Sequence, residues 1–218
     1  MKKVITLLFI SLFALTGTAQ NWITTKAGGG AAMRMGTSTF ETNPGAAIIG
    51  GLGYKHQLLK KLVVSGDVLI DLRLPTVVLP DGSTGAFSST YISVPITAQY
   101  LMPLKGKDLV PYKVSTTRNT WFLEGGPYFG YGLAVSGYDP AAGAENPNNI
   151  DVGLTAGVGF NFPFENNNQF TTGMRANYGF LNTYQAYSGG PVMNNFSAVA
   201  YIGLDISLTK RKHIRHRW

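Results

Sequence analysis

The chain has 218 residues, of which 44% are hydrophobic and 12% aromatic, and its mean hydropathy is +0.06. Charged residues make up 13%, about half the roughly 25% that is usual for a soluble domain. A disordered chain would be highly charged and poor in aromatic residues, so this composition excludes one. The absence of heptad runs excludes a coiled coil. Without cysteine, a disulfide scaffold, a thiolate zinc site and a lipoprotein anchor are excluded as well.

The net charge of +7 belongs to the two ends of the chain. Lys2, Lys3 and the basic residues of 210–217 account for all of it, so residues 20–209 are neutral. A nucleic-acid-binding protein would instead carry a basic face on its folded body. We therefore predict no nucleic-acid partner.

The amino terminus has the three parts of a secretory signal peptide. Lys2 and Lys3 precede an apolar run from Val4 to Leu15, and the small residues Gly17-Thr18-Ala19 follow as a cleavage site. A transmembrane helix needs about 20 apolar residues, whereas this run has 12. We expect residues 1–19 to be a signal peptide that exports the chain.

The rest of the chain alternates between apolar and polar residues. The alternation is strict over 151–164, where every even position is apolar, and it recurs over 170–181 and 196–208. Period-two alternation is typical of strands with two unlike faces. Less regular segments of the same kind, which bring the number of predicted strands to eight, cover 22–35, 46–58, 62–74, 91–102 and 120–135.

Turn-forming sequences separate these segments. None of them resembles a domain linker, so we expect strands joined in sequence as one antiparallel up-and-down β-barrel. This all-β domain would cover residues 20–209, followed by a basic tail over 210–218. The separators are 42–45, 80–82, 139–149, 165–168 and 188–191.

Either face of such a barrel could point inward. A soluble ligand-binding barrel hides its apolar face inside, whereas a membrane barrel turns that face to lipid. The apolar faces of all eight segments carry no charge, and the polar faces carry five residues of each sign, which suits a closed lumen where each charge needs a partner. The predicted lumen charges are Lys26, Arg34, Lys55, Asp67, Asp71, Arg73, Glu124, Asp151, Arg175 and Asp205.

Aromatic residues on the apolar faces gather near the ends of the segments. If the strands alternate in direction, these residues form two girdles, which are typical of a transmembrane barrel. This pattern favours the eight-stranded transmembrane β-barrel over the soluble one. The predicted girdle residues are Tyr54, Tyr100, Trp121, Phe162, Phe164 and Phe170 at one rim, and Phe180 and Phe196 at the other.

An even number of strands places both termini on the periplasmic side of an outer membrane. The connections near 59–61, 103–119 and 165–169 would then be periplasmic. The basic connection 103–119 is either a contact for a periplasmic partner or a plain solvated loop. For the tail 210–218 there are also two interpretations. It is a contact for anionic lipid or an acidic partner, or it is a solubilising end. The connections expected outside the cell are those near 36–45, 75–90, 136–150 and 182–195.

Several motifs are similar, in order and spacing, to those of a known family. Tyr91-Ile92-Ser93-Val94-Pro95 resembles the fourth-strand Y-x-x-x-P motif of the PorT-like outer-membrane β-barrel family, and 123–128 resembles its fifth strand. Residues 151–159 and 175–179 are similar to its sixth and seventh strands, so the resemblance spans nearly all of the chain after residue 19. It implies an eight-stranded outer-membrane barrel, and the namesake of the family takes part in protein secretion across the outer membrane.

The last predicted strand departs from the usual pattern. Residues 201–208 look like the signal that barrel-insertion machinery reads, but they carry aliphatic residues where aromatic ones are usual, and a tail follows them.

Catalytic motifs are absent from the sequence, which has no Walker loop, no Gly-x-Ser-x-Gly elbow and no His-Glu-x-x-His. His213 and His216 supply only two possible metal ligands in the tail. His56 lies on an apolar face without a serine or an acid beside it, so we expect an interfacial rim histidine. We predict no metal, no cofactor and no enzymatic activity.

These observations predict a non-enzymatic outer-membrane barrel of a Gram-negative-type bacterium, structural or accessory to protein secretion or surface assembly. The expected partners are outer-membrane lipid, the barrel-assembly machinery during insertion, and a secretion-system or envelope protein. The alternatives are a lipid-modifying enzyme of the same architecture, a soluble ligand-binding barrel and a small pore. The interior of an eight-stranded barrel is only just wide enough for side chains, which disfavours the pore.

Overall fold

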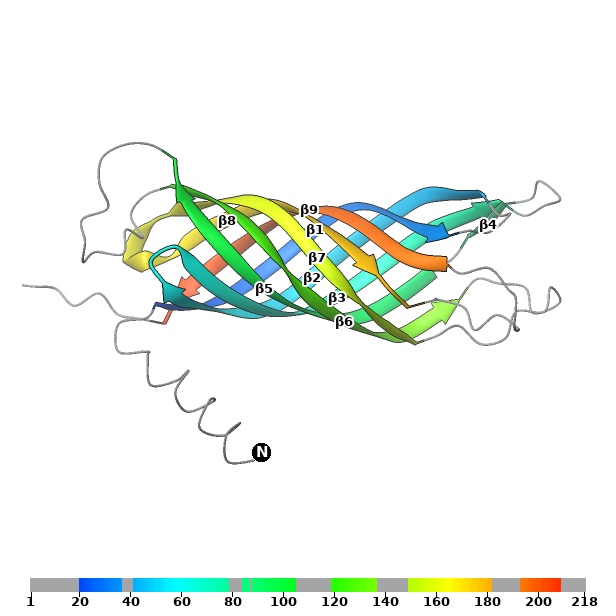
Figure 1. Ribbon diagram of the computed structural model, residues 1–218, viewed down its shortest axis with the longest axis horizontal. Helices are drawn as coiled ribbons and strands as arrows, with labels where there is room; N and C mark the ends of the chain where they lie inside the picture. Colours follow the sequence, from blue (N-terminus) through cyan, green and yellow to red (C-terminus); the bar gives the residue numbers. More distant parts are fainter. Residues whose placement is uncertain are drawn as a thin grey trace, which may run out of the picture.

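The alternating segments form long, tilted strands in the computed structural model of the chain (Figure 1). The structure describes residues 20–36, 41–78, 84–86, 88–104, 119–136, 149–181 and 193–208. The expected signal peptide, the basic tail and most of the connection 103–119 lie outside these residues. The strands are β1 (Asn21–Gly36), β2 (Glu41–Leu59), β3 (Leu62–Val78), β4 (Thr84–Ala86), β5 (Ser88–Pro103), β6 (Thr120–Ser136), β7 (Ile150–Pro163), β8 (Gln169–Gly179) and β9 (Met193–Ser207).

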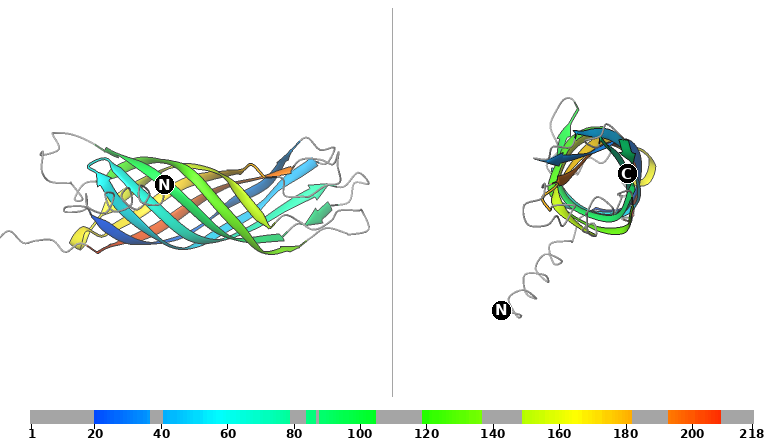
Figure 2. Two further views of the ribbon diagram at one scale, coloured as in Figure 1. Left: turned by 60° about the horizontal axis from the view of Figure 1, so that its bottom comes forward. Right: turned by 90° about the vertical axis from the view of Figure 1, so that its right-hand side faces the viewer.

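Eight of these strands close into a ring. Each pairs antiparallel with the next along the chain, from β1 through β2, β3, β5, β6, β7 and β8 to β9, and β9 pairs back with β1. The short strand β4 pairs only with the end of β3. The ring is visible end-on in Figure 2. The predicted all-β, eight-stranded antiparallel barrel with sequential strands is therefore confirmed.

The two ends of the barrel differ in their connections. The end that we call the turn end has the tight turn between β2 and β3, the turn between β7 and β8, and both Gln20 and Leu208. The turn between β7 and β8 contains the short 3-10 helix η2 (Glu165–Asn167). At the opposite loop end, β1 connects to β2, β3 to β5, β6 to β7 and β8 to β9. The connections group as predicted, and the end that faces the periplasm stays a prediction.

Some strands are longer than the alternation predicts. The turn expected at 42–45 is wrong, because residues 41–43 pair with 76–78 and belong to β2. A break in register between Asn43 and Ala46 accommodates Pro44 and Gly45 within the strand. Backbone pairing with β3 thus continues where the apolar-polar alternation has ended.

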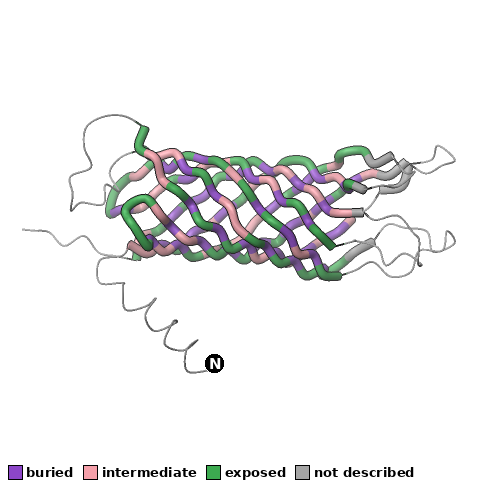
Figure 3. The backbone as a smooth tube through the Cα atoms, viewed as in Figure 1, coloured by how far each residue is buried: buried purple, intermediate pink, exposed green. Residues whose placement is uncertain are grey.

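The outer face of the barrel is apolar and the inner face is polar. Figure 3 shows buried and exposed positions alternating along the strands. Leu52, Val68, Leu154 and Met174 point outward and are 53–63% exposed. Buried positions alternate with these along the strands, and most of them are polar or charged. No helix among the described residues is long and apolar enough to cross a membrane.

Glycines on the inner face make room for aromatic rings in the lumen. Phe122 is fully buried there, and a Cβ atom added to Gly159 on the neighbouring strand would lie 2.4 Å from its Cζ atom. The same Cβ would lie 2.4 Å from the carbonyl oxygen of Thr172, which belongs to the backbone and cannot rotate away. The glycine is therefore needed for space at this position.

We predict that Gly159→Ala lowers the free energy of unfolding by about 1–3 kcal/mol, the usual cost of overpacking. The matched control is Gly66→Ala on the outer face, where an added Cβ meets nothing within 4 Å. Its effect is expected to stay within about 0.5 kcal/mol. Urea unfolding of the folded protein in lipid vesicles measures both values, and an equal loss in the two variants would contradict the explanation.

Candidate functional site: the charged lumen

All ten charged residues predicted for the lumen are buried, each with at most 5% of its surface exposed. They come from seven of the eight long strands, and β5 contributes uncharged partners instead. Period-two alternation places them inside, because they share the inward parity of their strands. Ion pairs and hydrogen bonds divide nine of them into three groups, which we name by position as the middle, turn-side and loop-side groups. Arg34 is assigned to the loop-side group by its place in the strand pairing.

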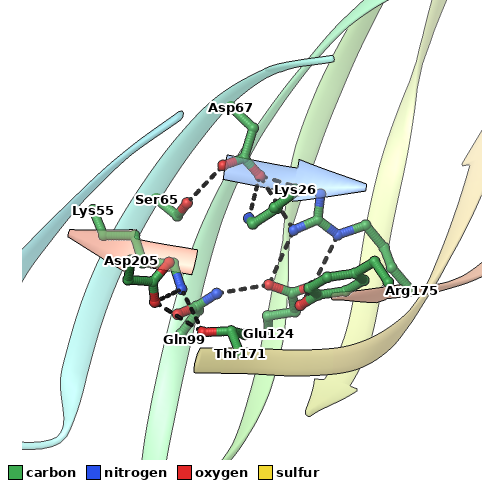
Figure 4. A network of polar contacts seen from close by, with 10 residues as sticks. Lys26, Lys55, Ser65, Asp67, Gln99, Glu124, Thr171, Arg175 and Asp205 are labelled. Carbon is green, nitrogen blue, oxygen red and sulfur yellow. Dashed lines mark hydrogen bonds and ion pairs between the residues drawn. The ribbon is translucent and has the colours of Figure 1, made fainter. Parts of the chain in front are cut away.

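The middle group joins two cations and two carboxylates (Figure 4). Lys26 Nζ lies 2.6 Å from Asp67 Oδ2. Arg175 forms a two-pronged contact with Glu124, from Nε to Oε1 at 2.8 Å and from Nη2 to Oε2 at 3.1 Å. Arg175 Nη1 also lies 3.3 Å from Asp67 Oδ2, so this aspartate links the two pairs.

Uncharged side chains complete the middle group. Gln99 Nε2 donates to Glu124 Oε2 at 2.9 Å, and the Tyr201 hydroxyl donates to Glu124 Oε1 at 3.2 Å. The Tyr201 ring also lies 5.6 Å from Lys26 Nζ and 5.4 Å from the guanidinium carbon of Arg175. Both cations thus contact an aromatic ring as well as a carboxylate, which compensates part of the cost of removing them from water.

The turn-side group is a single ion pair. Lys55 Nζ lies 2.7 Å from Asp205 Oδ2, and the Thr171 hydroxyl donates to the same oxygen at 2.8 Å. Figure 4 shows this pair beside the middle group. The two partners are 150 positions apart in the sequence, and it is the barrel that brings them together.

The loop-side group is centred on Arg73. Its Nε and Nη2 atoms donate to Asp71 Oδ2 at 3.0 and 2.6 Å, and its Nη1 donates to Asp151 Oδ2 at 2.8 Å. Tyr128 and Asn195 also donate to Asp151 Oδ2, each at 3.1 Å.

Two further lumen residues belong with the loop-side group. The buried Tyr91 ring lies 4.9 Å from the guanidinium carbon of Arg73. Arg34 is 2% exposed and lies opposite Asn195 in the pairing of β1 with β9. With Arg34 included, this group has two cations and two carboxylates, so each of the three groups is neutral.

The lumen is filled by these side chains. A water-filled channel would leave the polar side chains that line it exposed, whereas Asp67, Asp151 and Thr171 are at most 1% exposed. Pairing of the charges with one another and with hydrogen-bond donors offsets the cost of burying them. The arrangement holds the barrel walls together, and within the described residues no three metal-ligating side chains converge.

Sequence reasoning missed the aromatic residues of the lumen. They share the inward parity of the charged residues, and that parity is the signal that could have identified them. Their rings are buried among the lumen charges, and those of Tyr91 and Tyr201 lie against cations. They are Trp22, Tyr91, Phe122, Tyr128 and Tyr201.

The eight residues expected to form girdles lie on the outer face. Six of them are 38–53% exposed, and Trp121 and Phe196 are half-buried. Phe162 contacts both Phe160 and Phe170, with ring centroids 6.4 Å apart in each pair. The six expected at one rim, Tyr54, Tyr100, Trp121, Phe162, Phe164 and Phe170, lie near the turn end, and Phe180 and Phe196 lie near the loop end.

His56 is a member of a polar cluster on the outer face at the turn end. Its Nδ1 atom lies 2.6 Å from Asn21 Oδ1, which also accepts a hydrogen bond from the Tyr54 hydroxyl at 2.9 Å. No described contact joins His56 to a serine or an acid, as the arrangement of a hydrolase would require. His213 and His216 lie outside the described residues.

Comparison with solved structures places this fold among bacterial barrels. The chain is similar to the outer membrane protein OprG from Pseudomonas aeruginosa, with 11% sequence identity, a TM-score of 0.54, and coverage of 86% of this chain and 96% of that one. It is also similar to Neisserial surface protein A, at 10% identity, 84% and 97% coverage and a TM-score of 0.48. Ail of Yersinia pestis aligns at 13% identity, with 86% and 99% coverage and a TM-score of 0.44.

The likeness to OprG shows a shared fold and extends no further at this level of identity. No protein-family model matches the chain, and no curated protein matches it either. The chain thus has the closed, eight-stranded antiparallel fold that is also found in an outer-membrane protein.

We predict that Arg175→Ala lowers the thermal stability of the barrel without changing its ion conductance. The substitution removes the cation of Glu124 and one of the two cations of Asp67, which keeps Lys26. Breaking a buried pair in this way costs about 3–5 kcal/mol. Met174→Ala, the neighbouring outward position at 63% exposure, is the control for local truncation. The measurements are thermal unfolding in vesicles and conductance in planar bilayers. A large gain in conductance with unchanged stability would contradict a structural role.

Proposed function

We propose that this chain is a non-enzymatic outer-membrane β-barrel protein, closed to solutes, that serves a structural role or assists protein secretion or surface assembly. The observation that carries the proposal is the division of the barrel into an apolar outer face and a lumen filled with paired charges. The proposed location is the outer membrane of a Gram-negative-type bacterium, with the turn end in the periplasm.

Lipid is the environment that this outer face fits. Between the two ends of the barrel, the outward positions of the described strands carry no Asp, Glu, Lys or Arg. A soluble monomer rarely exposes an apolar patch of more than a few hundred Å², and here large apolar side chains are exposed on all eight long strands. Aromatic residues near both ends would lie at the two membrane interfaces.

The alternatives lack the features that they would need. A pore needs a water-filled path, whereas the polar side chains across the described lumen are buried and its carboxylates are paired with cations. A lipid-modifying enzyme would need a nucleophile, a base and an acid on one outer rim, and His56 contacts an asparagine and lies near a tyrosine. A soluble barrel would turn its apolar face inward.

The resemblance to PorT-like barrels supports the accessory role in secretion. Its motifs fall on β5, β6, β7 and β8 in the order that the family has them. The strand β9 would be the segment that barrel-assembly machinery recognises during insertion. The basic connection 103–119 and the tail 210–218 are the proposed contacts for a periplasmic or envelope partner.

An arginine placed in the middle of the outer face tests the membrane assignment. We expect Leu154→Arg to lower the free energy of unfolding in lipid vesicles by about 2–4 kcal/mol, the cost of a cation near the bilayer midplane. Leu58→Arg, on the outer face close to the turn end, is the matched control and is expected to cost about 1 kcal/mol or less. Urea unfolding measures both. Neutral effects at both positions, in a protein extracted without detergent, would indicate a soluble barrel.

Deletion of the gene tests the role in secretion. We expect the deletion strain to lose a defined set of extracellular proteins that a complemented strain recovers, because an accessory barrel is needed for their passage. The measurement is the extracellular protein profile of both strains. Intact outer-membrane composition in the deletion strain serves as the control for general envelope damage. An unchanged extracellular profile would reject the accessory role and leave a structural barrel.

A further inference from the structure

Three distant parts of the chain meet at the turn end: the start of β1, the end of β9, and the turn between β7 and β8 (Figure 2). The indole Nε1 of Trp22, on β1, donates a hydrogen bond to the backbone oxygen of Asn167 at 2.9 Å. The backbone N–H of Ser207, on β9, donates to Asn168 Oδ1, also at 2.9 Å. One turn therefore holds the first and the last strand of the barrel at the same time.

The backbone conformation of this turn places Asn167 against the end of the barrel. Asn166 and Asn167 have positive φ angles of 58° and 65°, a conformation that asparagine adopts more readily than most residues. Hydrogen bonds from Phe164 N to Asn168 O and from Asn168 N to Glu165 O close the turn on itself. As a result, Asn167 is only 7% exposed, although it lies in a tight turn at the end of the barrel.

The seam between β1 and β9 is the one that needs additional support. It joins strands from opposite ends of the chain, so its closure costs more chain entropy than that of a hairpin. Its outward side-chain pairs are small in the middle of the strands, where Gly29 faces Ala200 and Ala31 faces Ala198. Cross-strand side-chain contacts stabilise a sheet, and these pairs provide few of them.

We propose that the turn between β7 and β8 is a latch, formed by Asn167 and Asn168 with Trp22 and Ser207, that keeps the β1–β9 seam closed and slows the opening of the barrel. The contact of Ser207 continues the pairing of β8 with β9, in which Gln169 lies opposite Asp205. Trp22 comes from β1 and lies opposite Ser207 only in the closed barrel, so the contact of Trp22 with Asn167 completes the latch after the seam has formed. An interaction that forms after the transition state slows unfolding and leaves the folding rate unchanged. An open seam would expose unpaired backbone groups, which lipid cannot satisfy. The proposal concerns barrel closure and holds whichever partner the protein serves.

The kinetic test uses the full-length barrel folded into lipid vesicles. Asn168→Ala removes the acceptor for Ser207 and is expected to raise the unfolding rate about fivefold, the effect of one lost hydrogen bond, with an unchanged folding rate. Asn168→Asp keeps an acceptor oxygen at this position and is expected to unfold at the wild-type rate. Gln57→Met is the matched control, because it removes the Gln57 Nε2 hydrogen bond to Lys60 O in the turn between β2 and β3, and β2 lies on the other side of β1 from β9.

Hydrogen exchange then locates the opening. In Asn168→Ala we expect faster amide exchange over 21–24 and 204–207, the paired ends of β1 and β9, and unchanged exchange in β5 and β6. Trp22→Phe, which lacks the indole N–H, is expected to reproduce this local pattern. The latch is rejected if Gln57→Met accelerates unfolding equally, if Asn168→Ala changes the folding rate alone, or if protection falls evenly around the barrel.

Discussion

A strand that crosses a lipid bilayer must find a hydrogen-bond partner within the protein for each backbone N–H and C=O group, because lipid offers none. A sheet with an open edge fails this requirement along the whole edge strand. In this chain every long strand has two neighbours, because β1 pairs with β9 as well as with β2. Closure then separates an outer face that lipid can cover from an inner face that must be filled by its own side chains.

An interior this narrow is filled by three kinds of residue that depend on one another. Paired charges supply the polar contacts, aromatic rings occupy the volume between them, and glycines provide the space that the rings need. Tyr201 illustrates the connection, since its hydroxyl donates to Glu124 while its ring lies near Lys26 and Arg175. The contacts that fill the lumen are therefore also the contacts that join the strands of the wall to one another.

Alternation in the sequence predicted the number, order and direction of the strands, because one buried face imposes a period of two. It did not predict the first residues of β2 or the strand β4, whose pairing comes from the backbone of β3. The parity of the charged residues indicated that they share one face, but not that Lys55 contacts Asp205, which depends on the tilt and register of the closed barrel. The contacts of Trp22 and Ser207 with the turn could not be predicted from the sequence. Each of them uses a backbone atom, the Asn167 oxygen or the Ser207 N–H, and a backbone atom leaves no mark on the pattern of residue types.

The division of the lumen into three neutral groups has a consequence for how such a barrel can diverge. An exchange of charge within one group, such as a swap of the signs of Lys55 and Asp205, leaves the neighbouring groups balanced. If a cation of one group and a carboxylate of another group are exchanged instead, both groups are left with an unmatched charge. We expect substitutions in related chains to occur together within a group and independently between groups, so that the lumen evolves as three separate units inside a constant wall.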